Sequence, residues 1–115
     1  MMTVYENYER FDSSNVWYED GVIRRYDKKD KISSMHHIDY GLGVLKADIL
    51  NNQPSKTPFD ISLVYNKLSL QKQLAGYEVF ERFYEIGSLQ GIADTQKYLS
   101  QKITKDSLWV MQSNT

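Results

Sequence analysis

The stretch NVWYEDGVIRRY, residues 15–26, places Asp20 and Gly21 between two runs of strand-forming residues. An Asp-Gly pair readily takes the positive φ angles that a two-residue type I′ turn requires. The flanking residues 15–19 and 22–26 include Val, Ile, Trp and Tyr, which favour strands. The sequence therefore predicts a β-hairpin in this stretch.

Further strands are predicted on both sides of the hairpin. Residues 2–8 alternate polar with apolar or aromatic side chains, which is the period of a half-buried strand. Residues 38–46 have strand composition but contain Gly41 and Gly43, and glycine in a strand commonly marks the close approach of a ligand or another backbone. Between them, the lysine-rich residues 27–34 predict a surface loop.

Helical patterns occupy much of the second half of the chain. Residues 47–50 predict one helical turn, and Asp60 is placed to cap a longer helix. That helix has four apolar residues at helical spacing, which are Ile61, Val64, Tyr65 and Leu68. Such a stripe is expected to pack on a sheet.

The remaining elements follow residue 73. Residues 74–80 and 82–86 predict one strand, or two short ones, ending before Gly87. Ser88 is expected to cap a last helix that runs to about Gln101. Its inward residues are expected to be Leu89, Ile92 and Leu99, with Tyr98 alongside. Residues 108–111 are apolar enough to dock, and residues 112–115 are predicted to form a frayed tail.

Alternating strands and helices predict an α/β or an α+β fold. A chain of 115 residues suits a single domain, here residues 1–115. A parallel sheet normally opens with a strand, a turn and a helix that build a ligand site. Because this chain opens with a strand and a hairpin, we expect it to be part of a larger domain.

The charge balance and the residue types exclude several classes of function. Fourteen Lys and Arg against fifteen Asp and Glu give a net charge of -1, so strong binding to nucleic acid or to a membrane surface is not expected. There is no cysteine, and His36 and His37 are the only histidines, so neither a disulfide nor a dedicated zinc site is expected. The sequence has no long apolar segment and no signal-peptide pattern, which favours a cytoplasmic location.

Two charged clusters are candidates for substrate binding. In Tyr26-Asp27-Lys28-Lys29, a carboxylate beside an ammonium could bind a sugar hydroxyl and a phosphate, although charged residues at a strand end are often simply solvated. In Ile38-Asp39-Tyr40-Gly41, the carboxylate could accept hydrogen bonds from sugar hydroxyls while Gly41 leaves room for the ligand. Taken by themselves, these residues favour a glycine bulge with an exposed aspartate over a sugar site.

Two other clusters have weaker chemical meaning. Glu85, placed before Gly87 and Ser88, could offer a carboxylate oxygen to Mg²⁺, or could be an ordinary salt-bridge partner. His36 and His37 are adjacent and should point to different sides of a strand, so we interpret them as structural or solvent-facing. No Walker loop, Gly-x-Gly-x-x-Gly or Gly-x-Ser-x-Gly motif is present.

Eight short segments, in order, resemble the second half of the sugar-1-phosphate nucleotidyltransferase family, with the bacterial heptose and mannose 1-phosphate guanylyltransferases as the nearest in character. They are MTVY (2–5), SNV (14–16), DG (20–21), YDKK (26–29), IDYGL (38–42), FDI (59–61), LAGYEV (74–79) and FYEIGS (83–88). The resemblance implies the C-terminal part of a Rossmann-like fold with a mixed sheet, a β-hairpin and two to three helices. It implies synthesis of a nucleoside diphosphate sugar and pyrophosphate from a nucleoside triphosphate and a sugar 1-phosphate.

The resemblance also implies roles for five residues. Asp27 and Lys28 take the place of a Glu-Lys pair that holds the sugar 1-phosphate, the lysine on phosphate and the acid on a hydroxyl. Asp39 and Gly41 fall where an Asn-x-Gly segment lines the sugar pocket. Glu85 falls where an aspartate supplies one of two carboxylates to the catalytic Mg²⁺.

Two family features have no counterpart in this sequence, namely the Gly-rich loop with an arginine that holds the triphosphate and a mid-chain aspartate that binds the metal. We therefore expect a truncated chain, a split-gene product or a gene remnant that binds the triphosphate only with a separate N-terminal half and is inactive alone. Two alternatives remain open. One is a non-catalytic module that forms a homodimer, or pairs with an N-terminal chain, through an exposed sheet edge. The other is a plain sugar-phosphate-binding domain.

Overall fold

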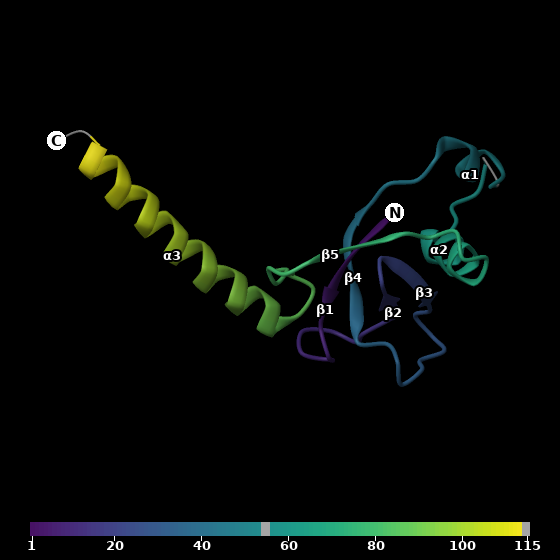
Figure 1. Cartoon of the computed structure of the whole chain (residues 1–115). Coiled ribbons are helices and arrows are strands. Elements are labelled where there is room, and N and C mark those ends of the chain that lie inside the picture. Colours follow the sequence, from purple (N-terminus) through teal and green to yellow (C-terminus); the bar gives the residue numbers. More distant parts are fainter. Residues whose placement is uncertain (54–55, 114–115) are drawn as a thin grey trace. The chain divides into compact units, whose positions relative to one another are not determined.

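Five strands form one mixed sheet, and the computed structural model describes residues 1–53 and 56–113. The strands are β1 (Met2–Glu6), β2 (Val16–Glu19), β3 (Val22–Tyr26), β4 (His37–Gly43) and β5 (Gly76–Val79). The helices are α1 (Ala47–Asn51), α2 (Ile61–Leu70) and α3 (Leu89–Ser113). The chain divides into two compact units (Figure 1), Met1–Arg82 with the sheet, α1 and α2, and Phe83–Thr115 with α3, where the sequence predicted one domain.

The strand order in the sheet is β3-β2-β4-β1-β5. β1 lies antiparallel to β4 and parallel to β5, whereas β2 is antiparallel to both of its neighbours. The predicted hairpin is present as β2 and β3. The structure therefore confirms the α/β class with a mixed sheet.

The turn of the hairpin lies against the start of β5. Asp20 and Gly21 have φ angles of 49° and 78°, as a type I′ turn requires. The carbonyl of Gly21 accepts the N–H of Gly76, and the N–H of Ile23 donates to the carbonyl of Leu74, each over 2.9 Å. Because β3 and β5 stand at opposite ends of the strand order, these bonds show that the sheet curls until its edge strands meet.

Helix α2 packs on one face of the sheet and closes the hydrophobic core. Asp60 is its N-cap, as predicted, and accepts the N–H of Ser62 over 2.8 Å. Val64, Tyr65 and Leu68 are buried, as their spacing predicted. They join a core of Met2, Val4, Val16, Ile23, Tyr26 and Leu74.

Ile61 was expected in the same stripe and is instead 40% exposed. It is the first residue of α2, and the nearby Phe59 and Leu63 are exposed as well. The helical period alone does not say how far along a helix the sheet extends.

The strands predicted at β4 and β5 were longer than the observed ones. β4 ends at Gly43 and not at residue 46, and β5 covers Gly76–Val79 within the predicted 74–80. Residues 82–86 form no strand. The carbonyl of Glu85 accepts the hydroxyl of Thr95 over 3.2 Å, so the start of α3, and not a neighbouring strand, provides its hydrogen-bond partner.

Helix α3 begins after Ser88, whose hydroxyl accepts the N–H of Gly91 over 2.9 Å, as the predicted cap should. It runs to Ser113, well past the predicted end at Gln101, because residues 102–113 contain neither glycine nor proline to stop it. Of the predicted tail, residues 112 and 113 are helical and 114–115 lie outside the described residues, as do the side chains of 108–111.

The face of α3 predicted to point inward is exposed. Leu89, Ile92 and Leu99 are 88%, 46% and 49% exposed, so the inward prediction is wrong for them. Tyr98 stacks on Tyr84 with 4.2 Å between ring centres. Across the described part of the chain, no helix combines the length and the apolar character needed to cross a membrane.

Candidate functional site

The end of β3 carries Asp27, whose carboxylate is bound by its own loop. Its Oδ1 accepts the backbone N–H groups of Lys29 and Asp30 over 2.9 and 3.0 Å. Its Oδ2 accepts Nδ2 of Asn66 over 3.1 Å and lies 3.5 Å from the guanidinium of Arg25. These bonds, above all those from the two backbone N–H groups, hold the pKa of Asp27 below its usual value. Asp27 therefore shapes the turn that presents Lys28.

The side chain of Lys28 is exposed at this turn. Among the described residues, its ammonium has no hydrogen-bond or ion-pair partner. It lies near the start of α2, where its charge adds to the effect of the Ser62 N–H in lowering the pKa of Asp60. An unpaired ammonium in this position is available to an anion.

Asp39 and Gly41 lie in β4 and form a local turn. Oδ1 of Asp39 accepts the N–H of Gly41 over 2.9 Å. Gly41 has a φ of 88°, in the region that favours glycine, and a side chain at this position would meet only open space. The bulge expected for this segment is therefore present, and it leaves the surface beside Gly41 open.

Asp39 faces the side of the sheet that α2 covers, because it pairs with the core residue Val4 across the strands. Burial is the main cause that raises the pKa of Tyr26 and Tyr65, and the negative charge of Asp39 raises both further. Among the described residues, Oδ2 of Asp39 has no hydrogen-bond partner. One carboxylate oxygen is thus left for a ligand.

Asn15, which the sequence analysis gave no role, joins the two predicted segments. Its carbonyl accepts the N–H of Asp27 over 3.0 Å, and its N–H donates to the carbonyl of His37 over 3.0 Å. Its side-chain Oδ1 accepts the N–H of Asp39 over 3.1 Å. The only sequence signal was its place in the SNV segment before the hairpin.

Glu85 belongs to the second unit, whereas the other four predicted residues belong to the first. Its carboxylate accepts the hydroxyl of Ser88 over 2.7 Å and the backbone N–H of Gly87. These bonds, first that from the Ser88 hydroxyl, lower its pKa. The carboxylate packs on Gly91 in the first turn of α3, where a Cβ would lie 1.9 Å from Oε1.

The two histidines have structural contacts. His36 stacks on Tyr8 with 4.7 Å between ring centres, and Nε2 of His37 lies 2.7 Å from Oε1 of Glu78. Among the side chains that the structure describes, no three His, Cys, Asp or Glu gather as a metal-binding group.

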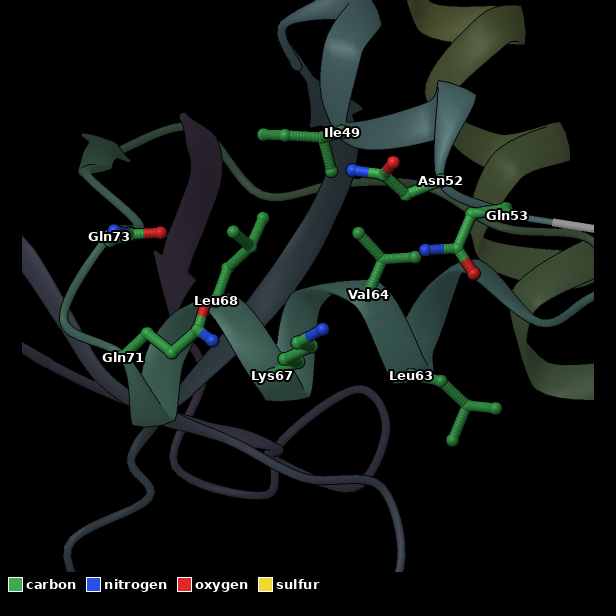
Figure 2. Close-up of a pocket in the computed structure, with 9 residues that line it drawn as sticks. All are labelled: Ile49, Asn52, Gln53, Leu63, Val64, Lys67, Leu68, Gln71 and Gln73. Atoms are coloured by element: carbon green, nitrogen blue, oxygen red, sulfur yellow. The ribbon is translucent and has the colours of Figure 1, made fainter.

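A pocket of about 450 Å³ lies between α1 and α2 (Figure 2). Ile49, Val64 and Leu68 form its apolar part, and its polar lining includes Gln53, Gln71 and Lys67. No carboxylate and no predicted site residue is among the residues that line it. This lining suits a neutral or anionic group better than a cation.

Comparison of the chain with protein-family models, with curated proteins and with solved structures found no match.

Proposed function

We propose that this chain is the sugar-phosphate-binding part of a sugar-1-phosphate nucleotidyltransferase of the guanylyltransferase type. The proposal rests on the ordered resemblance of its segments and on one observation of geometry. Lys28 presents an unpaired ammonium on a turn fixed by Asp27, and Asn15 ties that turn to the strand that carries Asp39.

Each residue has a distinct role in this proposal. Lys28 neutralises the phosphate of the sugar 1-phosphate, which positions its oxygen for attack on the α-phosphorus of a nucleoside triphosphate. Asp39 accepts a sugar hydroxyl through its free Oδ2, and Gly41 leaves room for the ring. Asp27 is already held by its loop, so its main task is to fix the turn, and its side chain keeps 19% exposure for a hydroxyl.

Glu85 is the described residue that would hold Mg²⁺ in the complete enzyme. After its bonds to Ser88 and Gly87, each carboxylate oxygen still has a lone pair. Mg²⁺ often takes only one or two protein carboxylates and fills its other positions from phosphates and water, which fits a lone glutamate. When bound, the ion would neutralise charge on the reacting phosphates.

Catalysis is expected only with a nucleotide-binding half. The sequence holds no Gly-rich triphosphate loop, and phosphoryl transfer depends on holding both reactants in place. The chain alone is therefore expected to bind a sugar phosphate without turning it over.

Lys28→Ala is expected to weaken the binding of mannose 1-phosphate about tenfold or more, because a hydrogen bond to a charged group is worth about 1.5–3 kcal/mol. Isothermal titration of the purified chain measures the effect. Lys67→Ala is the matched control, since it removes the same charge from the pocket between α1 and α2. Binding that depends on Lys67 and not on Lys28 would contradict the proposal and place the ligand in that pocket.

A homodimer through β5 is a second candidate function, favoured by the exposure of this edge. β5 stands last in the sheet order and pairs along its length with β1. On its other side, the described residues show a backbone bond only at Gly76, to the hairpin turn, so the edge beyond Gly76 is open. Tyr77 and Phe80 beside it are 60% and 84% exposed. Edge strands with exposed apolar side chains tend to pair with another copy.

Size-exclusion chromatography with light scattering is expected to give twice the 13.5 kDa mass at micromolar concentration if this edge pairs. Tyr77→Lys should return the chain to a monomer, because charge on an edge strand opposes pairing. Leu63→Lys, on the exposed side of α2, is the control and should leave the dimer intact. A monomer at every concentration would exclude this candidate.

A further inference from the structure

Asn15 is held in a single orientation by backbone bonds on both sides. Its N–H and its carbonyl bond to His37 and Asp27, and its side chain bonds to Asp39. The backbone N–H of Asp39 is a donor, so the side-chain atom that faces it has to be the oxygen. The other end of the carboxamide, Nδ2, therefore points away from Asp39 N–H, with its two hydrogens in a known place.

Those two hydrogens are not used by the protein. Among the described residues, Nδ2 of Asn15 has no hydrogen-bond acceptor, and the residue is partly exposed. Through its backbone and its Oδ1, Asn15 is hydrogen-bonded to the two segments that carry Asp27 and Asp39. The Nδ2 donor of Asn15 thus lies between the segment that carries Asp27 and the segment that carries Asp39. Lys28 directly follows Asp27 in the first of these segments.

We propose that Asn15 binds substrate directly and reads a hydroxyl group of the sugar, an assignment that rests on the proposed function. A hydroxyl is both a donor and an acceptor, so one sugar hydroxyl can accept from Nδ2 of Asn15 while it donates to the free Oδ2 of Asp39. The ionised oxygens of a phosphate only accept, and the carboxylate of Asp39 repels them. Asn15 and Asp39 therefore recognise the sugar ring, and Lys28 recognises the phosphate.

Asn15→Asp separates this role from a structural one. The aspartate keeps the shape and the oxygen that accepts the N–H of Asp39, but it replaces the two donors with an acceptor. Asn52→Asp makes the same chemical change at the C-cap of α1 and is the matched control. For each chain, titration calorimetry measures the dissociation constants of mannose 1-phosphate and of inorganic phosphate.

The readout is the ratio of the two dissociation constants. The added negative charge weakens the binding of both anions, whereas the lost donor weakens only the binding of the sugar. The preference for mannose 1-phosphate over phosphate is expected to fall about three- to tenfold in Asn15→Asp, the size of one neutral hydrogen bond, and to stay constant in Asn52→Asp. An unchanged preference in Asn15→Asp overturns the role of Asn15 alone. A wild-type chain that binds no sugar phosphate overturns this role and the proposed function together.

Deoxy analogues keep the proposal testable if Asn15→Asp fails to fold. On the wild-type chain, removing the hydroxyl that Asn15 reads should weaken binding about tenfold or more, because the bound ligand would then cover two polar partners that are left unpaired. The mono-deoxy mannose 1-phosphates are compared one by one. Equal affinity for all of them, within twofold, overturns the proposal.

Discussion

Tyr26→Ala is expected to lower the free energy of unfolding by about 3–5 kcal/mol, as truncation of a buried aromatic side chain usually does. Tyr26 is 1% exposed and is the largest of the fully buried side chains. Its ring meets that of Tyr65 edge-on with 5.7 Å between centres, and its N–H donates to the hydroxyl of Ser69 over 3.1 Å. Truncation opens a cavity between β3 and α2, beside the turn that carries Lys28.

Urea unfolding followed by circular dichroism measures this effect. Small domains are stable by about 5–15 kcal/mol, so the variant would lose a large share of its stability. Tyr26→Phe is the control, because it keeps the ring and removes a hydroxyl for which no partner is found among the described residues. A loss below about 1 kcal/mol in Tyr26→Ala would show that the core under β3 is not packed as described.

Gly76→Ala is expected to destabilise the chain by about 1–3 kcal/mol, the usual range for overpacking. A Cβ at Gly76 would lie 2.6 and 2.7 Å from two ring carbons of Tyr18 and 2.8 Å from Cδ1 of Ile23. Replacing a strand glycine by alanine ordinarily stabilises, because glycine loses more backbone entropy on folding. The close contact with the hairpin reverses that sign.

The same unfolding measurement tests the sign, and a double-mutant cycle tests the cause. Ile23→Val removes the methyl group nearest to the new Cβ, so Gly76→Ala should be less harmful in that background. A Gly76→Ala variant as stable as the wild type would mean that Tyr18 and Ile23 of the hairpin do not pack closely against Gly76.

Local chemistry accounts for the parts of the fold that the sequence predicted correctly. Asp20 and Gly21 required one turn type, and Asp60 before an apolar helical stripe required one helix start. Both signals act within a few residues. The strand expected at residues 82–86 failed because its composition suited a strand but no neighbouring strand pairs with it in the described structure.

The periodicity of apolar residues did not predict which elements pack against one another. The apolar spacing of Leu89, Ile92 and Leu99 marked a helix correctly, but a spacing pattern does not say whether a partner covers the stripe. For the same reason the sequence did not reveal that the tip of the hairpin meets Gly76.

The sequence suggested the candidate site residues by their type, but it did not reveal the hydrogen bonds that these residues make to their own loops. Asp27, Asp39 and Glu85 were each expected to bind a ligand, and each accepts a backbone N–H two residues further along the chain. Acidic side chains often close such local turns, so an acid followed by a turn was the available signal. Lys28 is exposed beside such a turn, and its role in binding phosphate stays a prediction.

The bonds between Gly21 and Gly76 and between Ile23 and Leu74 also constrain the order of folding. The hairpin is local and can form early, but its closure joins segments that lie far apart along the chain, and such pairings carry a large loop entropy and form slowly. During synthesis the edge of β3 has no partner until residues 74–76 leave the ribosome. While the residues between β3 and residue 76 are being synthesised, the nascent chain therefore exposes an open strand edge, and such edges favour aggregation.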